Sequence, residues 1–487
     1  MPLKCELVIV KKLRRVQIQI IMKTQKENKL YLLGITLIAT LGGLLFGYDT
    51  AVISGAVDPI KVFFQLDAEH YGKLANFYHG STVSSALIGC IIGGIISGFF
   101  ASKLGRKKSL MIASAFLFVS AVGSGYPEMF FFSSQTSIST LLVSFNVYRI
   151  IGGIGVGMAS AICPMYIAEI APADIRGKLV SWNQFAIIFG MLVVYFVNFF
   201  IVNDKPTEWI NSIGWRYMFV SEAYVASVFA FMLLLVPETP RYLTLINKEE
   251  KALEVLSKIN GLVKAKEILL EIKDSAHEKV EKVLSYGWKV LIIGVLLSVF
   301  QQVVGINVVL YYAPTIFKGL GFGSNAAMWQ TVIMGFVNII FTLVAIYNVD
   351  KFGRKPLLII GSIGMAIGMF AIGLLAYLHI IGVSTLIFIV IYSAAFMMSW
   401  GPICWVLISE IFPNTIRGKA VAIAVGAQWV INFIVSSSFP ALAAFSIPFT
   451  YFLYGTMSVL SAFFVWKMVP ETKGKTLEEM TKIWEKR

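Results

Sequence analysis

Twelve long apolar stretches, separated by short polar segments, dominate the pattern of hydrophobic and polar positions along this 487-residue chain. A helix needs about 20 mainly apolar residues to cross the hydrocarbon core of a bilayer, whereas a transmembrane β-barrel would show alternating segments of about ten residues. The pattern therefore predicts an all-α membrane protein. The expected spans are 30–56, 79–102, 108–126, 139–163, 179–201, 215–236, 289–317, 326–348, 356–378, 383–408, 419–439 and 447–469.

Composition and charge agree with a membrane location. Hydrophobic residues make up 57% of the chain and charged residues only 14%. The net charge of +14 does not indicate nucleic acid, because 35 of the 41 Lys and Arg residues fall on one side when both termini are placed in the cytoplasm. By the positive-inside rule, we expect a multi-pass inner-membrane protein with both termini in the cytoplasm. We also expect it to be a monomer in the lipid bilayer.

An internal repeat divides the chain. Residues 169–178 (EIAPADIRGK) return as 410–419 (EIFPNTIRGK), and the segments around Arg106 and Glu238 return around Arg354 and Glu471. Three offsets near 240 indicate duplication, as in transporters with parallel repeats. The expected organisation is an N-terminal tail (1–29, with Met22 as an alternative start), a six-helix bundle (30–236), an intracellular helical linker (237–288), a second six-helix bundle (289–469) and a cytoplasmic tail (470–487).

The polar linker and the cysteines suggest no chemistry. Residues 248–258 form an amphipathic pattern, and the basic linker is interpreted either as a lipid-binding latch or as a solvated connection. Cys5, Cys90, Cys163 and Cys404 have no metal-ligand spacing. We expect no metal, no cofactor and no catalytic residues, which argues against a membrane enzyme.

Asp49 and Arg149 are the deepest opposite charges in the first half. Ionisable groups in hydrocarbon cost about 2.5–3.5 kcal/mol on insertion scales, so we predict that the two side chains pair. A carboxyl that alternates between paired and unpaired environments can bind a proton on one side and release it on the other. The alternative is a fixed pair that only locks two helices together.

A second polar cluster consists of amides and aromatic residues in the fifth, seventh, tenth and eleventh spans. An amide offers a donor and an acceptor, as binding a neutral sugar requires, while an indole can cover the apolar face of the ring. Gly305 and Pro314 are expected to loosen the seventh span and free backbone groups to line a cavity. Interhelical hydrogen bonding is the alternative role. The candidate residues are Gln184, Gln301, Gln302, Asn307, Tyr311, Trp405 and Gln428.

Charged residues at the expected cytoplasmic ends recur in both halves, which suggests gates. Ion pairs between the bundles would form when the inner side closes and part when it opens. Fixed charges that set the topology are the alternative. The gating candidates are Arg106, Glu169, Arg176, Glu222, Asp350, Arg354, Glu410 and Arg417.

From about residue 30 onward, the chain resembles the sugar porter family of the major facilitator superfamily. The motifs that carry the resemblance are 105–107 (GRK), 237–241 (PETPR), 301–307 (QQVVGIN), 350–354 (DKFGR) and 470–475 (PETKGK). Residues 39–55, 148–157 and 399–405 are most similar to the bacterial carriers that take up D-xylose with a proton.

The resemblance implies import of a monosaccharide, D-xylose first, with proton coupling at Asp49 and Arg149. It adds Asn338 and Trp429 to the expected sugar contacts and places Phe46 in the cavity wall. Facilitative relatives commonly have Asn at the position of Asp49, so the carboxylate favours symport. A facilitative uniporter and a non-transporting sugar sensor remain the alternatives, although the tail after Pro470 is short for a sensor.

Two positions depart from the family pattern. Met191 stands where the xylose carriers have a second Gln, which puts the preferred sugar, xylose or a related hexose, in question. Ser102 stands where the family usually has Asp, so the first-half gate is expected to be weaker than the second.

Overall fold

The predicted helical architecture is confirmed in the computed structural model. It describes residues 28–129, 137–172, 175–275, 282–319, 321–380, 382–474, 480 and 483–484, without the side chains of Asp350 and Asn414. Across these ranges the regular structure is helical, with no strand, and twelve helical segments are long and apolar enough to cross a membrane.

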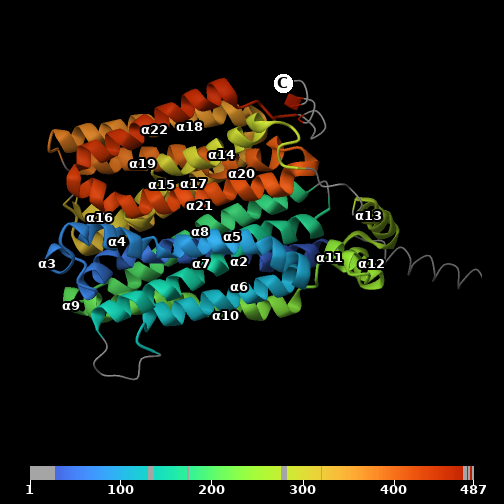
Figure 1. Cartoon of the computed structure of the whole chain (residues 1–487), viewed down its shortest axis with the longest axis horizontal. Helices are drawn as coiled ribbons and strands as arrows, with labels where there is room; N and C mark the ends of the chain where they lie inside the picture. Colours follow the sequence, from blue (N-terminus) through green and yellow to red (C-terminus); the bar gives the residue numbers. More distant parts are fainter. Residues whose placement is uncertain are drawn as a thin grey trace, which may run out of the picture.

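The helices of the first half form one side of the molecule, coloured blue to green in Figure 1. Six long segments cross the bundle, and short helices cap the loops between them. The bounds are α2 (Lys29–Phe63), α3 (Ala68–Tyr71), α4 (Ala75–Val83), α5 (Ser85–Leu104), α6 (Arg106–Gly125), α7 (Ile138–Ile170), α8 (Arg176–Val202), α9 (Thr207–Trp209) and α10 (Trp215–Leu235).

Three helices then lead to the second half, coloured yellow to red (Figure 1). These are α11 (Pro240–Leu245), α12 (Glu249–Asn260) and α13 (Leu262–Ser275). The second half contains α14 (Trp288–Val303), α15 (Ile306–Tyr311), α16 (Ala313–Gly319), α17 (Ser324–Phe352), α18 (Arg354–Tyr377), α19 (Val383–Met398), α20 (Trp400–Ile411), α21 (Asn414–Phe445) and α22 (Ile447–Met468).

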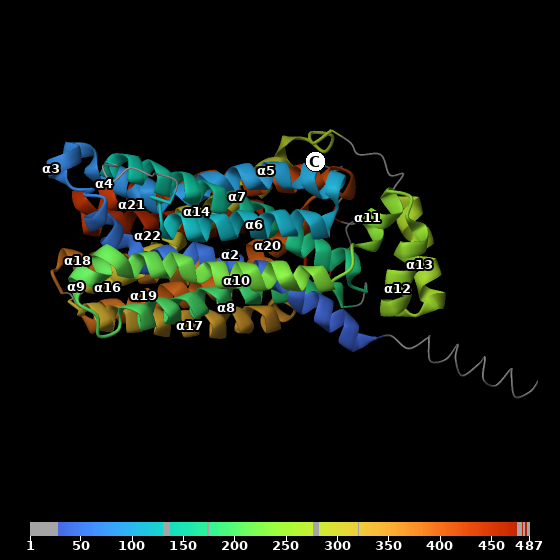
Figure 2. The same ribbon diagram turned by 90° about the horizontal axis from the view of Figure 1, so that it is seen from below.

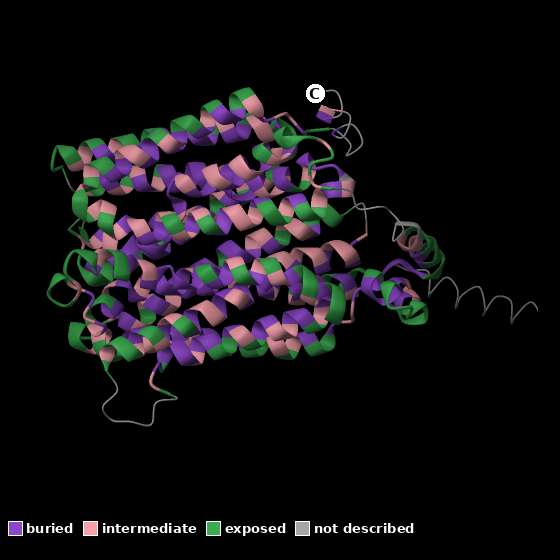
Figure 3. Cartoon of the chain, in the orientation of Figure 1, coloured by how far each residue is buried: buried purple, intermediate pink, exposed green. Residues whose placement is uncertain are grey.

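The two ends of the bundle differ. Helices α11–α13 lie at one end, here called the linker end, and α3, α4, α9 and α16 lie at the other, here called the loop end (Figures 1 and 2). Buried and exposed residues alternate along the long helices (Figure 3). Large apolar side chains such as Ile95 and Phe99 are mostly exposed, as expected of a surface that faces lipid rather than water.

Two of the spans are interrupted. One break lies where the sequence predicts loosening, and the other lies beside Gly and Pro residues. α14 ends at Val303, and Gly305 adopts a φ of +91° before α15 begins. A Cβ at Gly305 would also lie 2.9 Å from the Tyr454 ring, so both backbone and space require glycine. α19 and α20 are separated at Ser399. Both breaks lie at membrane depth within protein, where freed backbone groups are tolerated.

Glycines bring α5 and α7 into backbone contact. A Cβ at Gly93 would lie 2.2 Å from the Ile154 carbonyl oxygen, and one at Gly153 would lie 1.8 Å from that of Ala86. Gly89, Gly93, Gly153 and Gly157 therefore pack closely between these two helices. An added Cβ at Gly94 or Gly98 would meet nothing within 4 Å, because it would point away from α7.

Adjacent glycines on α5 provide a matched test of this packing. We expect Gly93→Ala to destabilise the protein by about 1–3 kcal/mol, because the methyl group meets a backbone carbonyl that cannot move alone. Gly94→Ala should be neutral or slightly stabilising, since alanine is the better helix former. Thermal unfolding of the two variants in detergent measures the difference, and equal transition temperatures would contradict the assigned packing.

Candidate functional site

A central cavity lies between the two halves, where the interrupted helices meet. Its walls come from α2 and α8 of the first half and from α14, α15, α19, α20 and α21 of the second. The lining residues are Phe46, Thr50, Gln184, Ile187, Ile188, Met191, Gln301, Gln302, Ile306, Asn307, Leu310, Tyr311, Phe396, Met397, Gly401, Trp405, Gln428, Trp429 and Asn432.

The amides of the second half are held by one another and by freed backbone carbonyls. Gln301 Nε2 donates to the Trp400 carbonyl at 2.9 Å, where α19 gives way to α20. Gln302 Nε2 donates to Gln301 Oε1 at 3.2 Å, and Asn307 donates to the Gln302 oxygen. This chain fixes the direction of each amide, so the cavity is already organised before a ligand enters.

The opposite side of the cavity combines aromatic and apolar groups with free polar atoms. The Phe46 and Trp429 rings, from different halves, lie 5.7 Å apart. Gln428 Oε1 and Trp429 Nε1 are buried and have no hydrogen-bond partner among the described residues. Unsatisfied polar atoms beside a cavity are costly and are suited to binding hydroxyl groups.

Nine of the ten predicted sugar contacts line the cavity, and one does not. The Asn338 side chain is buried on α17 and accepts a hydrogen bond from Ser393 at 2.6 Å, so it joins two helices instead. Thr50 and Asn432 line the cavity and were not predicted. Asn432 follows Gln428 by one helical turn, a spacing that places both on one face.

The predicted pair of Asp49 and Arg149 is present. Arg149 Nη1 donates to Asp49 Oδ1 at 2.6 Å, with both side chains 2% exposed. The guanidinium carbon also lies 5.2 Å from the centre of the Phe219 ring. Asp49 immediately precedes Thr50 on α2, so the ion pair and the cavity wall share one turn of helix.

Glu222 lies beside this ion pair and not at the cytoplasmic end where it was predicted. It is fully buried in α10, and neither carboxylate oxygen has a hydrogen-bond partner among the described residues. Its main electrostatic neighbours are Asp49 and Arg149. The neighbouring Ser221 hydroxyl lies 2.7 Å from the Tyr48 hydroxyl, which joins α10 to the turn of α2 that carries Asp49.

At the loop end the two halves are in direct contact. Lys318 of α16 pairs with Asp58 of α2 at 2.9 Å, and the Thr315 hydroxyl donates to the other oxygen of the same carboxylate. A Cβ at Gly80 of α4 would lie 2.0 Å from the Ser437 carbonyl oxygen of α21. These contacts close the cavity toward the loop end.

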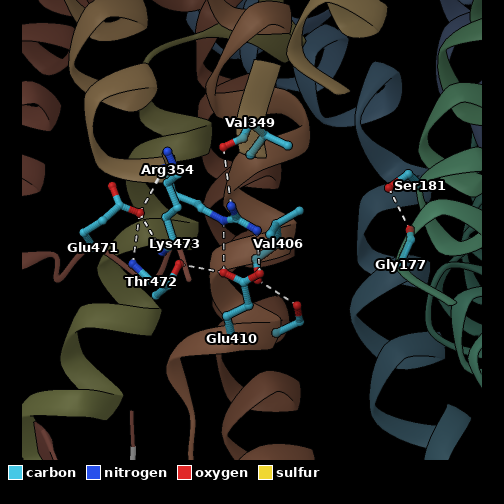
Figure 4. A network of polar contacts seen from close by, with 10 residues as sticks. Gly177, Ser181, Val349, Arg354, Val406, Glu410, Glu471, Thr472 and Lys473 are labelled. Carbon is cyan, nitrogen blue, oxygen red and sulfur yellow. Dashed lines mark hydrogen bonds and ion pairs between the residues drawn. The ribbon is translucent and has the colours of Figure 1, made fainter. Parts of the chain in front are cut away.

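At the linker end, the predicted gating residues form an equivalent ion pair in each half. Arg106 pairs with Glu169 at 2.7 Å in the first half, and Arg354 pairs with Glu410 at 3.0 Å in the second (Figure 4). Both pairs join helices of the same half, not the two bundles as predicted, because each arginine lies at the start of a helix beside its own half's carboxylate. Arg176 and Arg417 reach backbone carbonyls of Ala171 and Phe412.

Each half also places a carboxylate on the N-terminus of a helix. Glu238 accepts from the backbone N–H groups of Arg106 and Lys107, and Glu471 from those of Arg354 and Lys355. Burial raises the pKa of Glu238 despite these bonds. Burial acts in the same direction on Glu471, but the backbone N–H groups outweigh it and the pKa is lowered.

Comparisons with known proteins agree with this arrangement. Residues 35–484 match the family model described as sugar (and other) transporter. The chain is 53% identical to the D-xylose-proton symporter of Escherichia coli K12, over 95% of this chain and 98% of the relative. It is 37% identical to the glucose facilitated diffusion protein of Zymomonas mobilis, over 92% and 97%.

A solved structure extends the similarity to three dimensions. The inward open conformation of the xylose transporter XylE from E. coli superposes with a TM-score of 0.84 at 52% identity, covering 93% of this chain and all of that one.

The opposite pKa shifts of the two capping carboxylates can be tested by pH. A carboxyl with a lowered pKa stabilises the folded protein above its ordinary value of 4.5 and loses that contribution as pH falls through the folded pKa. Glu471→Gln should therefore cost up to about 1 kcal/mol at pH 7 and less at pH 4.

Glu238→Gln is the matched control, since its raised pKa reverses the sign: acidification should stabilise the wild type relative to this variant. Thermal inactivation in detergent at both pH values measures these differences. An effect of Glu471→Gln that does not change with pH would contradict the assignment.

Proposed function

Because the chain belongs to the sugar transporter family, we propose that it is a sugar/proton symporter that imports a monosaccharide, D-xylose first, by alternating access. The observation that carries this proposal is the buried Asp49–Arg149 pair, which lies one residue from the wall of an amide-lined cavity. The cavity accounts for sugar binding, and the pair supplies a carboxyl for the proton.

The cavity suits a polyhydroxylated ring. The amides of Gln184, Gln301, Gln302, Asn307 and Gln428 can donate to or accept from sugar hydroxyls, and Trp405 and Phe46 supply flat apolar surfaces for the C–H face. The free Gln428 and Trp429 atoms would gain partners when a sugar enters. Sugar binding would thereby relieve unsatisfied groups in addition to forming new contacts.

Proton coupling follows from the charges of the buried group. One guanidinium faces two carboxyls, Asp49 and Glu222, and only Asp49 is hydrogen-bonded to it. An unpaired charge in a buried site is strongly unfavourable, so a proton taken up by Asp49 would free Arg149 to turn toward Glu222. We propose that this exchange of partners converts protonation into movement of α2, α7 and α10.

The charge distribution indicates which side of the membrane each end of the molecule faces. The linker end, with its basic residues, is proposed to be cytoplasmic, which makes the loop end periplasmic in a bacterial inner membrane. The contact of Asp58 with Lys318 then closes the outer side. Residues 30–236 and 289–469 are proposed to rock as two bundles around the cavity, and we expect the protein to act as a monomer.

The paired residues at the linker end have a related role in this proposal. Arg106, Glu169, Arg354 and Glu410 form ion pairs within each bundle. They would exchange for pairs between the bundles when the cytoplasmic side closes, together with Arg176, Arg417 and Asp350. A facilitative uniporter is the second candidate function, supported by the similarity to a glucose facilitator.

A comparison of uphill uptake by the wild type and by Asp49→Asn separates a symporter from a uniporter. In proteoliposomes with an inward proton gradient, the wild type should concentrate labelled D-xylose. At one proton per sugar, a driving force of 2.3 kcal/mol per 100 mV allows accumulation on the order of 50-fold. Asp49→Asn should only equilibrate the sugar while its exchange of labelled for unlabelled xylose continues.

The uncoupler control uses the wild type, whose accumulation should collapse. Wild-type uptake that is indifferent to the gradient would reject symport and leave a uniporter. Transport of D-glucose or D-galactose without D-xylose would retain the symporter and reject the sugar.

Met191→Gln tests which residue limits the affinity for sugar. Met191 is buried in the cavity wall and offers no hydrogen bond. Glutamine adds a donor and an acceptor, so the KM for D-xylose should fall about fivefold to tenfold, as expected for one new hydrogen bond. Met191→Leu keeps the wall apolar and should leave KM unchanged. Equal values for the two variants would show that Met191 does not set the affinity.

A further inference from the structure

Two serines of α6 are buried without the hydrogen bonds that serines usually make in apolar helices. Ser120 and Ser124 are both fully buried, and neither hydroxyl has a partner among the described residues. On the same helix, Ser109 donates to the Gly105 carbonyl and Ser114 to the Met111 carbonyl. Serine in a helix ordinarily bonds back in this way, so the two free hydroxyls call for another explanation.

Ser120 lies beside the buried ion pair. A Cβ added to Gly152 of α7 would lie 2.2 Å from Ser120 Oγ and 3.7 Å from Asp49 Oδ1. Both oxygens are therefore within 4 Å of one point beside Gly152, and less than about 6 Å from each other. One bridging water can span such a separation between the hydroxyl and the carboxylate.

Ser124 lies one turn farther toward the loop end. Its neighbour Gly123 packs on the Tyr148 ring, and Gly125 packs on the Arg216 carbonyl of α10. The Arg216 side chain donates to the Gly125 carbonyl at 3.0 Å and pairs with Glu128, whose side chain is 44% exposed. Ser120 and Ser124 lie one helical turn apart on α6, and the partly exposed Glu128 follows in the turn after that helix ends.

This row is separate from the sugar cavity. The lining residues of the cavity come from α2, α8, α14, α15 and α19–α21, and none comes from α6. Asp49 itself is buried and does not line the cavity. A carboxyl that must exchange protons with one side therefore has a polar neighbourhood on α6 that the sugar does not occupy.

We propose that Ser120 and Ser124 form, with bound water, a proton path from the loop end to Asp49 that runs inside the first half and bypasses the sugar cavity. This inference rests on the proposed proton coupling. A hydroxyl can accept a proton on a lone pair while it gives up its own. Overall, a hydronium ion at the loop end becomes water, and the Asp49 carboxylate becomes a carboxylic acid.

Arg149 would control this path. While the guanidinium is paired with Asp49 at 2.6 Å, it competes with an incoming proton for the carboxylate. Protonation of Asp49 therefore accompanies the release of Arg149, which has Glu222 as its other carboxyl neighbour. A path that delivers protons only when the pair opens does not leak in the closed arrangement.

The test compares the double variant S120A/S124A with S114A, which removes a satisfied hydroxyl from the same helix. Removing unpartnered hydroxyls should not impair folding. In proteoliposomes, the initial rate of proton-driven xylose uptake by S120A/S124A should fall about tenfold. This is the change expected if the barrier to proton transfer rises by the free energy of about one hydrogen bond. Exchange without net proton movement should stay at the wild-type rate, and S114A should match the wild type in both assays.

Each other outcome has a defined meaning. Proton-driven uptake by S120A/S124A as fast as that of S114A would overturn the proposed path. A parallel loss of exchange would also overturn it, because it would assign the serines a packing role. Failure of the wild type to concentrate sugar would reject the underlying symport itself. This outcome is distinguishable from failure of the proposed path, because it appears in the wild type and not only in S120A/S124A.

Discussion

The ion pair between Asp49 and Arg149 constrains the first half of the molecule more than any other contact. Two opposite charges with 2% exposure are stable only if they remain together and are enclosed on all sides. The enclosure comes from three helices: α2 and α7 carry the charges, and α10 covers Arg149 with the Phe219 ring. Glu222 adds a second buried carboxyl to the neighbourhood of this pair.

The two halves share a backbone plan but divide the chemistry. At the linker end the repeat is conserved in three dimensions, with Glu238 and Glu471 on equivalent helix starts. At membrane depth the halves diverge, since the buried charges lie in the first half and most of the cavity amides lie in the second. The repeat thus gives the two halves a similar scaffold, and the asymmetry of the polar residues separates the buried charges from most of the cavity amides.

The sequence predicts what depends on hydropathy and on rare polar residues, and little that depends on side-chain direction. The spans follow from apolar length, and Asp49 and Arg149 could be paired because they are the deepest opposite charges of the first half. Glu222 was misplaced because charge at a span position does not reveal depth. Asn338 lies outside the cavity lining, since its amide bonds Ser393, a contact that a resemblance does not reveal.

Coupling between proton and sugar must cross from one half to the other, and thermodynamic linkage requires that it act equally in both directions. If protonation of Asp49 favours sugar binding, bound sugar must favour protonation by the same factor. The residues positioned to transmit this effect are Thr50, next to Asp49, and Phe46, one turn away, whose ring meets Trp429 of the second half at 5.7 Å. A sugar that displaces Trp429 would press on the same turn of α2 that holds the carboxyl. In the proposed mechanism, the segment 46–50 of α2 therefore connects the buried carboxyl with the cavity wall.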